Sequence, residues 1–262
     1  MEKKNFKIVE SKKTRYILPN ILTIAGVCLG ISSIKFSLDL NFSMAVIFIT
    51  LAAILDALDG RIARLIKGTT DFGKELDSLT DFVSFGIAPA FIIYFWELNK
   101  YGKLGWAITL IYSVCCVLRL ARFNLTKFKP EETWKQNYFE GVPSPIGALL
   151  ILSPLVLELT EFNFFINNNY FVPLFTLVIA VLLISKVPTY SFKKIKIKPA
   201  LTVFILLAIG ISLVTLMFFT FETLLMFSLL YILSIPIAIF TFYNNKKSTQ
   251  IDNSEDEHED VL

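Results

Sequence analysis

Four aspartates lie at the polar ends of two apolar segments of the chain. Asp56 and Asp59 are three residues apart, and Asp77 and Asp81 are four apart, so each pair would share one face of a helix. An ionised aspartate at bilayer depth costs on the order of 3 kcal/mol. Four such residues converging on one place indicate a functional site, and a divalent cation would hold the four carboxylates together.

The connection between the two segments is short, so we expect antiparallel neighbouring helices whose aspartate pairs face each other. Carboxylates this close bind either protons or cations. Oxygen ligands alone suit hard ions such as Mg²⁺ or Mn²⁺, and two ions that share bridging carboxylates act on phosphoryl groups. The spacing therefore predicts a metal centre for phosphoryl chemistry. The alternative is that these charges only set the orientation of the helices.

Residues between the aspartate pairs suit a phosphate ligand. Gly60 and Ala63 keep one helix face small, so that a ligand can approach the backbone. Arg64 offers a planar fork of donors for phosphate, and Gly73 lies where the next apolar segment begins.

The general base of such a site is expected to be a carboxylate. The only histidine, His258, lies in an acidic stretch near the end of the chain, away from the apolar segments. Cys28, Cys115 and Cys116 all fall within apolar stretches, and we interpret them as packing residues, because adjacent cysteines are poorly placed to bond each other.

The elements that must position these residues are membrane helices. The 262-residue chain is 55% hydrophobic, with a mean hydropathy of +0.63, and the apolar residues are spread over many segments of about 20 residues, each long enough to cross a bilayer. Backbone polar groups in lipid must bond internally, so the spans are helices. We predict an all-α polytopic membrane protein with eight spans, at 17–38, 42–64, 75–96, 104–123, 142–160, 170–187, 199–219 and 223–243.

The basic residues predict the orientation of these spans. All lysines and arginines except Lys35, Lys100 and Lys103 fall on one side of the membrane, and an excess of these residues marks the cytoplasmic side. Both termini and the aspartates are therefore expected on the cytoplasmic side of the plasma (inner) membrane. The basic N-terminus also resembles a signal peptide, but no small-residue cleavage site follows it, so we interpret residues 17–38 as a retained span. Residues 244–262 are polar and acidic and are expected to be a disordered tail.

The string from Asp56 to Asp81, with Gly60, Ala63, Arg64 and Gly73 at their spacings, resembles the signature of the CDP-alcohol phosphotransferase family. Members are membrane enzymes that transfer a phosphoalcohol or phosphatidyl group from a CDP-linked donor to an alcohol and release CMP. The resemblance implies a six-helix catalytic domain, here 17–198, preceded by the basic segment 1–16 and followed by two additional helices at 199–243. It also implies a homodimer, a site open to the cytoplasmic leaflet and two divalent ions.

The resemblance also implies roles for individual residues. Asp56, Asp59 and Asp77 would be metal ligands. Asp81 would border the metal as a further ligand and take the proton of the acceptor hydroxyl. The CDP-linked lipid would be bound by Asn20, Thr23, Gly60, Ala63, Arg64 and Gly73.

Three further stretches, 118–124, 139–145 and 188–193, resemble the bacterial membrane-integral phosphatidylserine synthases, and the opening Leu18-Pro19-Asn20 with Thr23 agrees with this. The implied substrates are CDP-diacylglycerol and L-serine. Arg119 and Arg122 end one span three residues apart, so one or both could bind the carboxylate of serine or the pyrophosphate, and Asn124 could hydrogen-bond the amino acid. The two arginines could instead only anchor the span at the cytoplasmic surface.

Two alternatives remain open for the function. The acceptor could be glycerol 3-phosphate, an inositol phosphate or choline. A cation-coupled transporter could also use an aspartate cluster, although the chain shows no internal repeat of the kind common in transporters. Membrane lipids are expected partners, and nucleic acid is not.

Overall fold

The computed structural model describes residues 17–66, 70–125, 138–160, 170–190 and 202–259, and all eight predicted spans correspond to helices within this part of the chain. Five of the helical segments are long and apolar enough to cross a membrane: Ile17–Leu38, Phe42–Leu65, Asp71–Trp96, Lys103–Leu125 and Thr220–Asn244. The other three are shorter apolar helices, Ser144–Leu159, Phe171–Ile184 and Thr202–Phe218. The prediction of an all-α polytopic membrane protein is confirmed.

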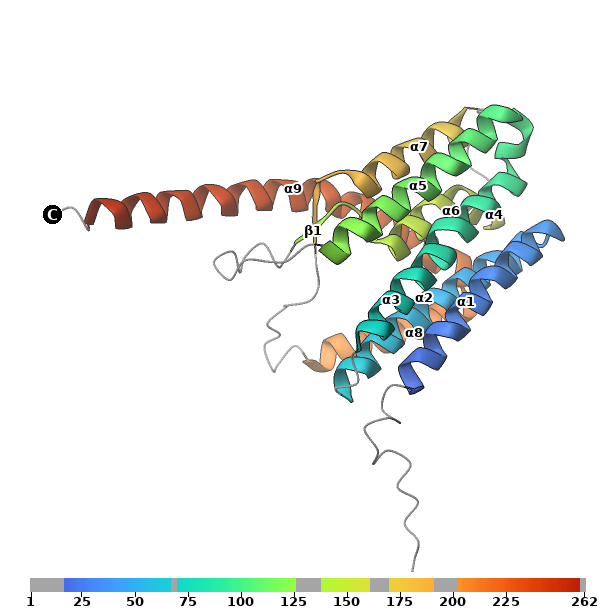
Figure 1. Ribbon diagram of the computed structural model, residues 1–262, viewed down its shortest axis with the longest axis horizontal. Helices are drawn as coiled ribbons and strands as arrows, with labels where there is room; N and C mark the ends of the chain where they lie inside the picture. The colour runs from blue at the N-terminus through green and yellow to red at the C-terminus, as the bar shows by residue number, and fades with distance from the viewer. Residues whose placement is uncertain (1–16, 67–69, 126–137, 161–169, 191–201, 260–262) are drawn as a thin grey trace, which may run out of the picture.

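Helices α1 (Ile17–Leu38) and α2 (Phe42–Leu65) form an antiparallel hairpin and pack along their length (Figure 1). The turn between them is short because Asn41 caps α2, its side chain accepting a hydrogen bond from the backbone N–H of Met44 at 3.2 Å. The hairpin carries Asp56 and Asp59 near its far end, on the last turns of α2.

The third span is a helix in three parts. It begins with α3 (Asp71–Asp81), continues as the π-helix η2 (Phe82–Ile87) and ends as α4 (Ala88–Trp96). Thr70 caps its start, its hydroxyl accepting from the N–H of Gly73 at 3.0 Å. The π segment starts directly after Asp81, and such wider turns are common at functional sites.

Small residues on α1 let the third span approach closely. A Cβ atom added at Gly30 would lie 2.7 Å from Ser84 Oγ and 3.0 Å from its Cα. The Ser84 hydroxyl also donates to the carbonyl of Gly26, at 3.3 Å. This contact fixes α3 and η2 against the α1–α2 hairpin and so sets the distance between the two aspartate pairs.

The apolar core lies among α4, α5 (Lys103–Leu125), α6 (Ser144–Leu159) and α7 (Phe171–Ile184). The short 3₁₀ helix η3 (Leu98–Tyr101) joins α4 to α5. The Tyr112 hydroxyl, which is fully buried, donates to the carbonyl of Phe85 at 3.0 Å and ties α5 to the π-helix.

Two three-residue strands, which the sequence analysis did not predict, pair on the side of α5 where that helix ends. Strand β1 (Tyr138–Glu140) is antiparallel to β2 (Pro188–Tyr190), with Phe139 opposite Thr189. Gly141 follows β1 with φ of +76°, and an added Cβ would lie 2.8 Å from the carbonyl oxygens of both Leu183 and Ser185. Only glycine suits this position, because it needs both the left-handed backbone and the missing side chain.

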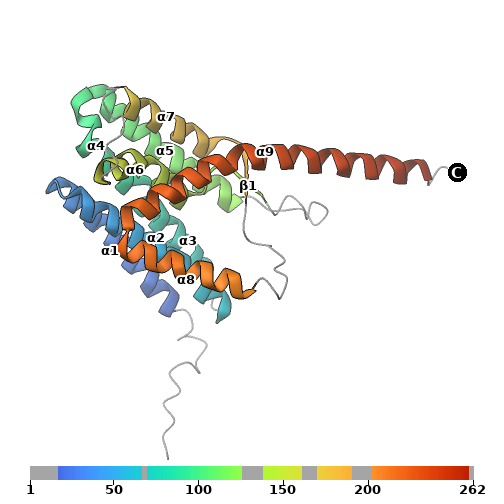
Figure 2. The same cartoon turned by 180° about the vertical axis from the view of Figure 1, so that it is seen from behind.

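Helices α8 (Thr202–Phe218) and α9 (Thr220–Glu259) cover the face that Figure 2 turns toward the viewer. The first half of α9 packs on α6 and β2. Thr241 on α9 lies 2.7 Å from the Tyr190 hydroxyl and accepts from the Tyr138 hydroxyl at 3.3 Å.

The length of α9 differs from expectation. We expected the last span to end near residue 243 and a disordered tail to follow, but α9 continues as a helix to Glu259. Its sequence has neither glycine nor proline after Pro236, so nothing in it stops the helix. The predicted basic segment 1–16 lies outside the described residues.

Candidate metal centre and acceptor pocket

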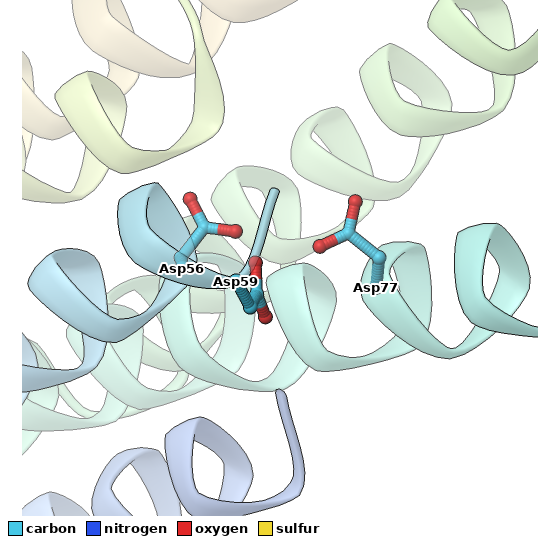
Figure 3. A group of neighbouring side chains, drawn as sticks. All are labelled: Asp56, Asp59 and Asp77. Atoms are coloured by element: carbon cyan, nitrogen blue, oxygen red, sulfur yellow. The ribbon is translucent and has the colours of Figure 1, made fainter. Parts of the chain in front are cut away.

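Three of the four predicted carboxylates meet in one cluster. Asp56 and Asp59 project from α2 and Asp77 from α3, and Figure 3 shows the carboxylates of Asp56 and Asp77 directed toward each other. One carboxylate oxygen of each residue can be chosen so that all three lie within 4.8 Å of one another. This spacing suits a shared cation, and the three donors are oxygens, as hard divalent ions prefer.

Asp59 is the most constrained member of this cluster. It is buried, with 4% of its surface exposed, and the Thr23 hydroxyl of α1 donates to its Oδ2 at 2.5 Å. The carbonyl of Pro19 also lies within reach of the Thr23 hydroxyl, at 3.0 Å. Helix α1 therefore orients a prospective metal ligand on α2, the kind of support that metal sites need from neighbouring residues.

Asp81 lies one helical turn beyond Asp77 and borders the cluster. Its carboxyl group is within electrostatic reach of Asp56, Asp77 and the guanidinium of Arg119. Its Oδ1 atom is buried and has no hydrogen-bond partner among the described residues. A buried carboxylate oxygen without a partner costs free energy unless a ligand or a proton reaches it, so Asp81 is suited to exchange a proton with a substrate.

A pocket of about 280 Å³ opens beside the cluster, and it gathers the residues that the sequence predicted for the CDP-linked lipid. Gly60 leaves room under the guanidinium of Arg64, whose Nη1 would lie 3.7 Å from a Cβ added there. Arg64 also lies within electrostatic reach of Asp77. The pocket is lined by Pro19, Asn20, Thr23, Asp59, Gly60, Ala63, Arg64, Thr70, Gly73, Lys74 and Asp77.

Thr70 and Lys74 are lining residues that the sequence analysis missed. Thr70 could have been recognised, because threonine is one of the residues preferred at the N-cap of a helix. Gly73 packs closely against Thr70 and Asn20, whose Oδ1 would lie 3.3 Å from an added Cβ, so a larger residue here would have to displace these side chains.

Arg119 and Arg122 have different surroundings, although they are three residues apart on α5. Arg119 is buried, with 8% of its surface exposed, and its Nη1 donates to the Ser144 hydroxyl at the start of α6. Arg122 donates to the carbonyls of Ile184 at 2.7 Å and Ser185 at 3.1 Å, at the end of α7. Arg119 also lies within electrostatic reach of Asp81, whereas Arg122 satisfies the free carbonyls at a helix C-terminus.

Asn124 lies two residues after Arg122, at the exposed end of α5. Its side-chain amide donates to the Ser78 hydroxyl of α3 at 2.9 Å. Asn124 therefore joins α5 to α3, the helix that carries Asp77 and Asp81.

This fold and this site define an integral membrane protein with a carboxylate-lined polar centre beside a pocket that is lined in part by Arg64 and Lys74. The model of the family described as CDP-alcohol phosphatidyltransferase matches residues 16–184, and the chain belongs to this family. The match spans α1 to α7 and includes all four aspartates, whereas α8 and α9 lie beyond it.

Several relatives that all carry the same name are similar to this protein over most of its length. A protein of Mycobacterium tuberculosis named CDP-diacylglycerol–serine O-phosphatidyltransferase is 32% identical over 224 residues, covering 85% of this chain and 78% of the relative. A Helicobacter pylori protein of the same name is 36% identical, covering 76% of this chain and 81% of the relative. A Bacillus subtilis protein of that name is 34% identical, over 68% of this chain and 92% of the relative.

Proposed function

We propose that this protein transfers the phosphatidyl group of CDP-diacylglycerol to the hydroxyl of L-serine, giving phosphatidylserine and CMP. Membership of the family supports the reaction class, and the names of the relatives support serine as the acceptor. The observation that carries the proposal is the cluster of Asp56, Asp59 and Asp77 with the buried, unpaired oxygen of Asp81 beside it.

The carboxylates of Asp56, Asp59 and Asp77 would hold divalent metal, Mg²⁺ or Mn²⁺, and we expect two ions as in the family, with Asp81 as a bordering ligand. When bound, the metal would neutralise the charge of the pyrophosphate and make CMP a better leaving group. Without it, three carboxylates within 4.8 Å of one another would repel each other and the anionic substrate.

The residues of the pocket would bind the donor. Arg64 and Lys74 supply positive charge for the pyrophosphate, while Gly60, Ala63 and Gly73 leave space for the nucleotide. Asn20 and Thr23, which lie on α1, line the same pocket. We propose that the lipid part of the donor stays in the bilayer while its headgroup lies over α2 and α3.

Asp81 would act as the general base. It takes the proton of the serine hydroxyl, and the serine oxygen attacks the phosphorus that carries diacylglycerol. The bond from that phosphorus to the oxygen of CMP breaks, so one displacement completes the transfer. Arg119, buried beside Asp81, would bind the serine carboxylate. We assign Arg122 and Asn124 to holding α5 against α7 and α3 around this pocket.

Release of CMP by the purified protein in detergent tests the proposal. With CDP-diacylglycerol and Mn²⁺ or Mg²⁺, we expect CMP only when L-serine is present and no CMP after chelation of the metal. Glycerol 3-phosphate, inositol phosphate and choline serve as competing acceptors. Metal-dependent release with one of these instead of serine would overturn the choice of acceptor. Absence of CMP with every acceptor, together with cation uptake into vesicles, would favour a transporter.

A further inference from the structure

Tyr231 on α9 has a buried hydroxyl that finds no hydrogen bond among the described residues. The ring packs against the apolar core, so the side chain is fixed in place. Thr189 of β2 and the guanidinium of Arg119 are polar neighbours of this hydroxyl. A phenylalanine would fill the same space without an unpaired polar atom, so packing alone does not account for the hydroxyl.

The neighbours of Tyr231 leave its hydroxyl available to a ligand. The Thr189 hydroxyl donates to the carbonyl of Gly141 at 2.8 Å, so towards Tyr231 it could only accept, and the Tyr231 hydroxyl forms no hydrogen bond with it or with any other described group. Arg119 donates to Ser144 but forms no salt bridge within 4.0 Å to any described carboxylate. A buried guanidinium that keeps N–H groups without a carboxylate partner therefore lies within electrostatic reach of a buried phenol hydroxyl that has no hydrogen bond among the described residues.

This pair of donors matches one kind of ligand. A carboxylate has two oxygens, one of which can accept from the guanidinium and the other from the neutral phenol. A doubly charged phosphate monoester would call for additional cations, and Arg122, the next arginine on α5, is hydrogen-bonded to backbone carbonyls of α7. Asp81 lies within electrostatic reach of Arg119, so a small acceptor held there could present its hydroxyl to the base.

We propose that Tyr231 completes the acceptor site, its hydroxyl donating to the carboxylate of the amino-acid acceptor that Arg119 binds. This inference rests on the proposed function, because it assumes an acceptor with a carboxylate. It assigns substrate recognition to α9, which lies beyond the part of the chain that the family model matches. The two additional helices are then part of the active site rather than a membrane anchor alone.

The test compares Tyr231→Phe with wild type in the full-length protein, by measuring CMP release over a range of L-serine and of CDP-diacylglycerol. A hydrogen bond to a charged group is worth roughly a factor of 10 to 100 in binding. We expect the KM for serine to rise by about that factor, while the KM for CDP-diacylglycerol stays the same. Tyr243→Phe is the matched control, because Tyr243 is 62% exposed on the same helix.

Ethanolamine, which lacks the carboxylate, gives a second readout. Tyr231→Phe should reduce the preference for serine over ethanolamine in kcat/KM, because only serine loses a contact. An unchanged KM for serine, an equal rise in both KM values, or loss of the folded protein in Tyr231→Phe would overturn the inference. Wild type without serine-dependent CMP release would instead contradict the proposed function itself.

Discussion

The individual carboxylates of the centre have different surroundings, and their expected roles differ accordingly. Asp59 is buried and held by Thr23, so it is fixed before any ligand arrives. Asp56 and Asp77 face each other from separate helices, so their spacing depends on how α2 and α3 are each packed against α1. Asp81 alone has a buried oxygen without a partner among the described residues, which leaves it free to accept a proton.

Replacing Asp81 by asparagine should abolish turnover while the protein still folds. The amide keeps the size of the side chain but cannot accept the proton of the acceptor hydroxyl, and a general base contributes about 10²- to 10⁴-fold to a rate. CMP release measures the loss, and size-exclusion chromatography in detergent checks the fold. Asp39→Asn is the control, because this carboxylate is 53% exposed in the turn between α1 and α2. Normal activity in Asp81→Asn would remove Asp81 from the role of base.

Arg122 should behave as a structural residue, in contrast to Arg119. Arg122→Gln removes the donors that bind the carbonyls of Ile184 and Ser185 at the end of α7. We expect a lower melting temperature, with the KM for serine changed less than twofold. Arg119→Gln should instead raise that KM at least tenfold, since a buried charge-assisted contact is lost. A KM effect in Arg122→Gln without any loss of stability would return Arg122 to the acceptor site.

The aspartates were predictable from the sequence because charges in apolar segments are costly and their spacing restricts them to one helix face. The different roles of the two arginines were not predictable, because they depend on where the end of α7 lies relative to α5. The role proposed for Tyr231 was not predictable either. A single tyrosine in an apolar span is common, and its neighbours Arg119 and Thr189 are distant in the sequence.

At the scale of elements, the close contact between α1 and η2 holds the two halves of the site at a fixed distance. Gly30 touches the backbone of Ser84, and the Ser84 hydroxyl reaches the carbonyl of Gly26. Neither helix could move outward without separating Thr23 from Asp59 or η2 from α2. Element positions followed from hydropathy, but the β1–β2 pair did not, because its three-residue strands are far apart in the chain and too short for a periodic signal.

Gly30→Val should destabilise the protein by about 1–3 kcal/mol, the usual cost of overpacking. The added Cβ would lie 3.0 Å from the Cα of Ser84, an atom that cannot move aside without the helix. Gly210→Ala on α8 is the control, since an added Cβ there meets nothing within 4 Å. Melting temperatures in detergent compare the two variants, and equal values would show that α1 and η2 are not tightly coupled.

At the scale of the whole molecule, eight helical segments in the described part of the chain bring the polar residues of the site together where α2 ends and the third span begins. We propose from the distribution of basic residues that this end faces the cytoplasm. The sequence predicted the positions of the spans because length and hydropathy are properties of local sequence. It could not predict that α9 packs on α6 and β2 and brings Tyr231 within electrostatic reach of Arg119, because this placement depends on the tertiary arrangement.

Cysteine labelling tests this orientation. In a variant without Cys28, Cys115 and Cys116, single cysteines replace Asp39 or Asp71, whose side chains are 53% and 100% exposed. A membrane-impermeant maleimide added to intact cells should label position 39 and spare position 71, and inverted vesicles should reverse the pattern. Labelling of position 71 in intact cells would place the aspartates on the outer side.

The π-helix after Asp81 affects the direction in which the later side chains of the third span point. Each residue of an α-helix turns the chain by about 100°, so one residue more or less rotates everything beyond it by that angle. A π turn holds about one residue more than an α turn, so a single deletion within 82–87 would leave a regular α turn and keep the direction of α4. A second deletion would turn α4 by about 100°, and Ala88, Ile92 and Ile93, which are fully buried, would then face away from the core. The wider turn lets one helix present a polar face to the substrate and, one turn later, a differently directed apolar face to the bundle.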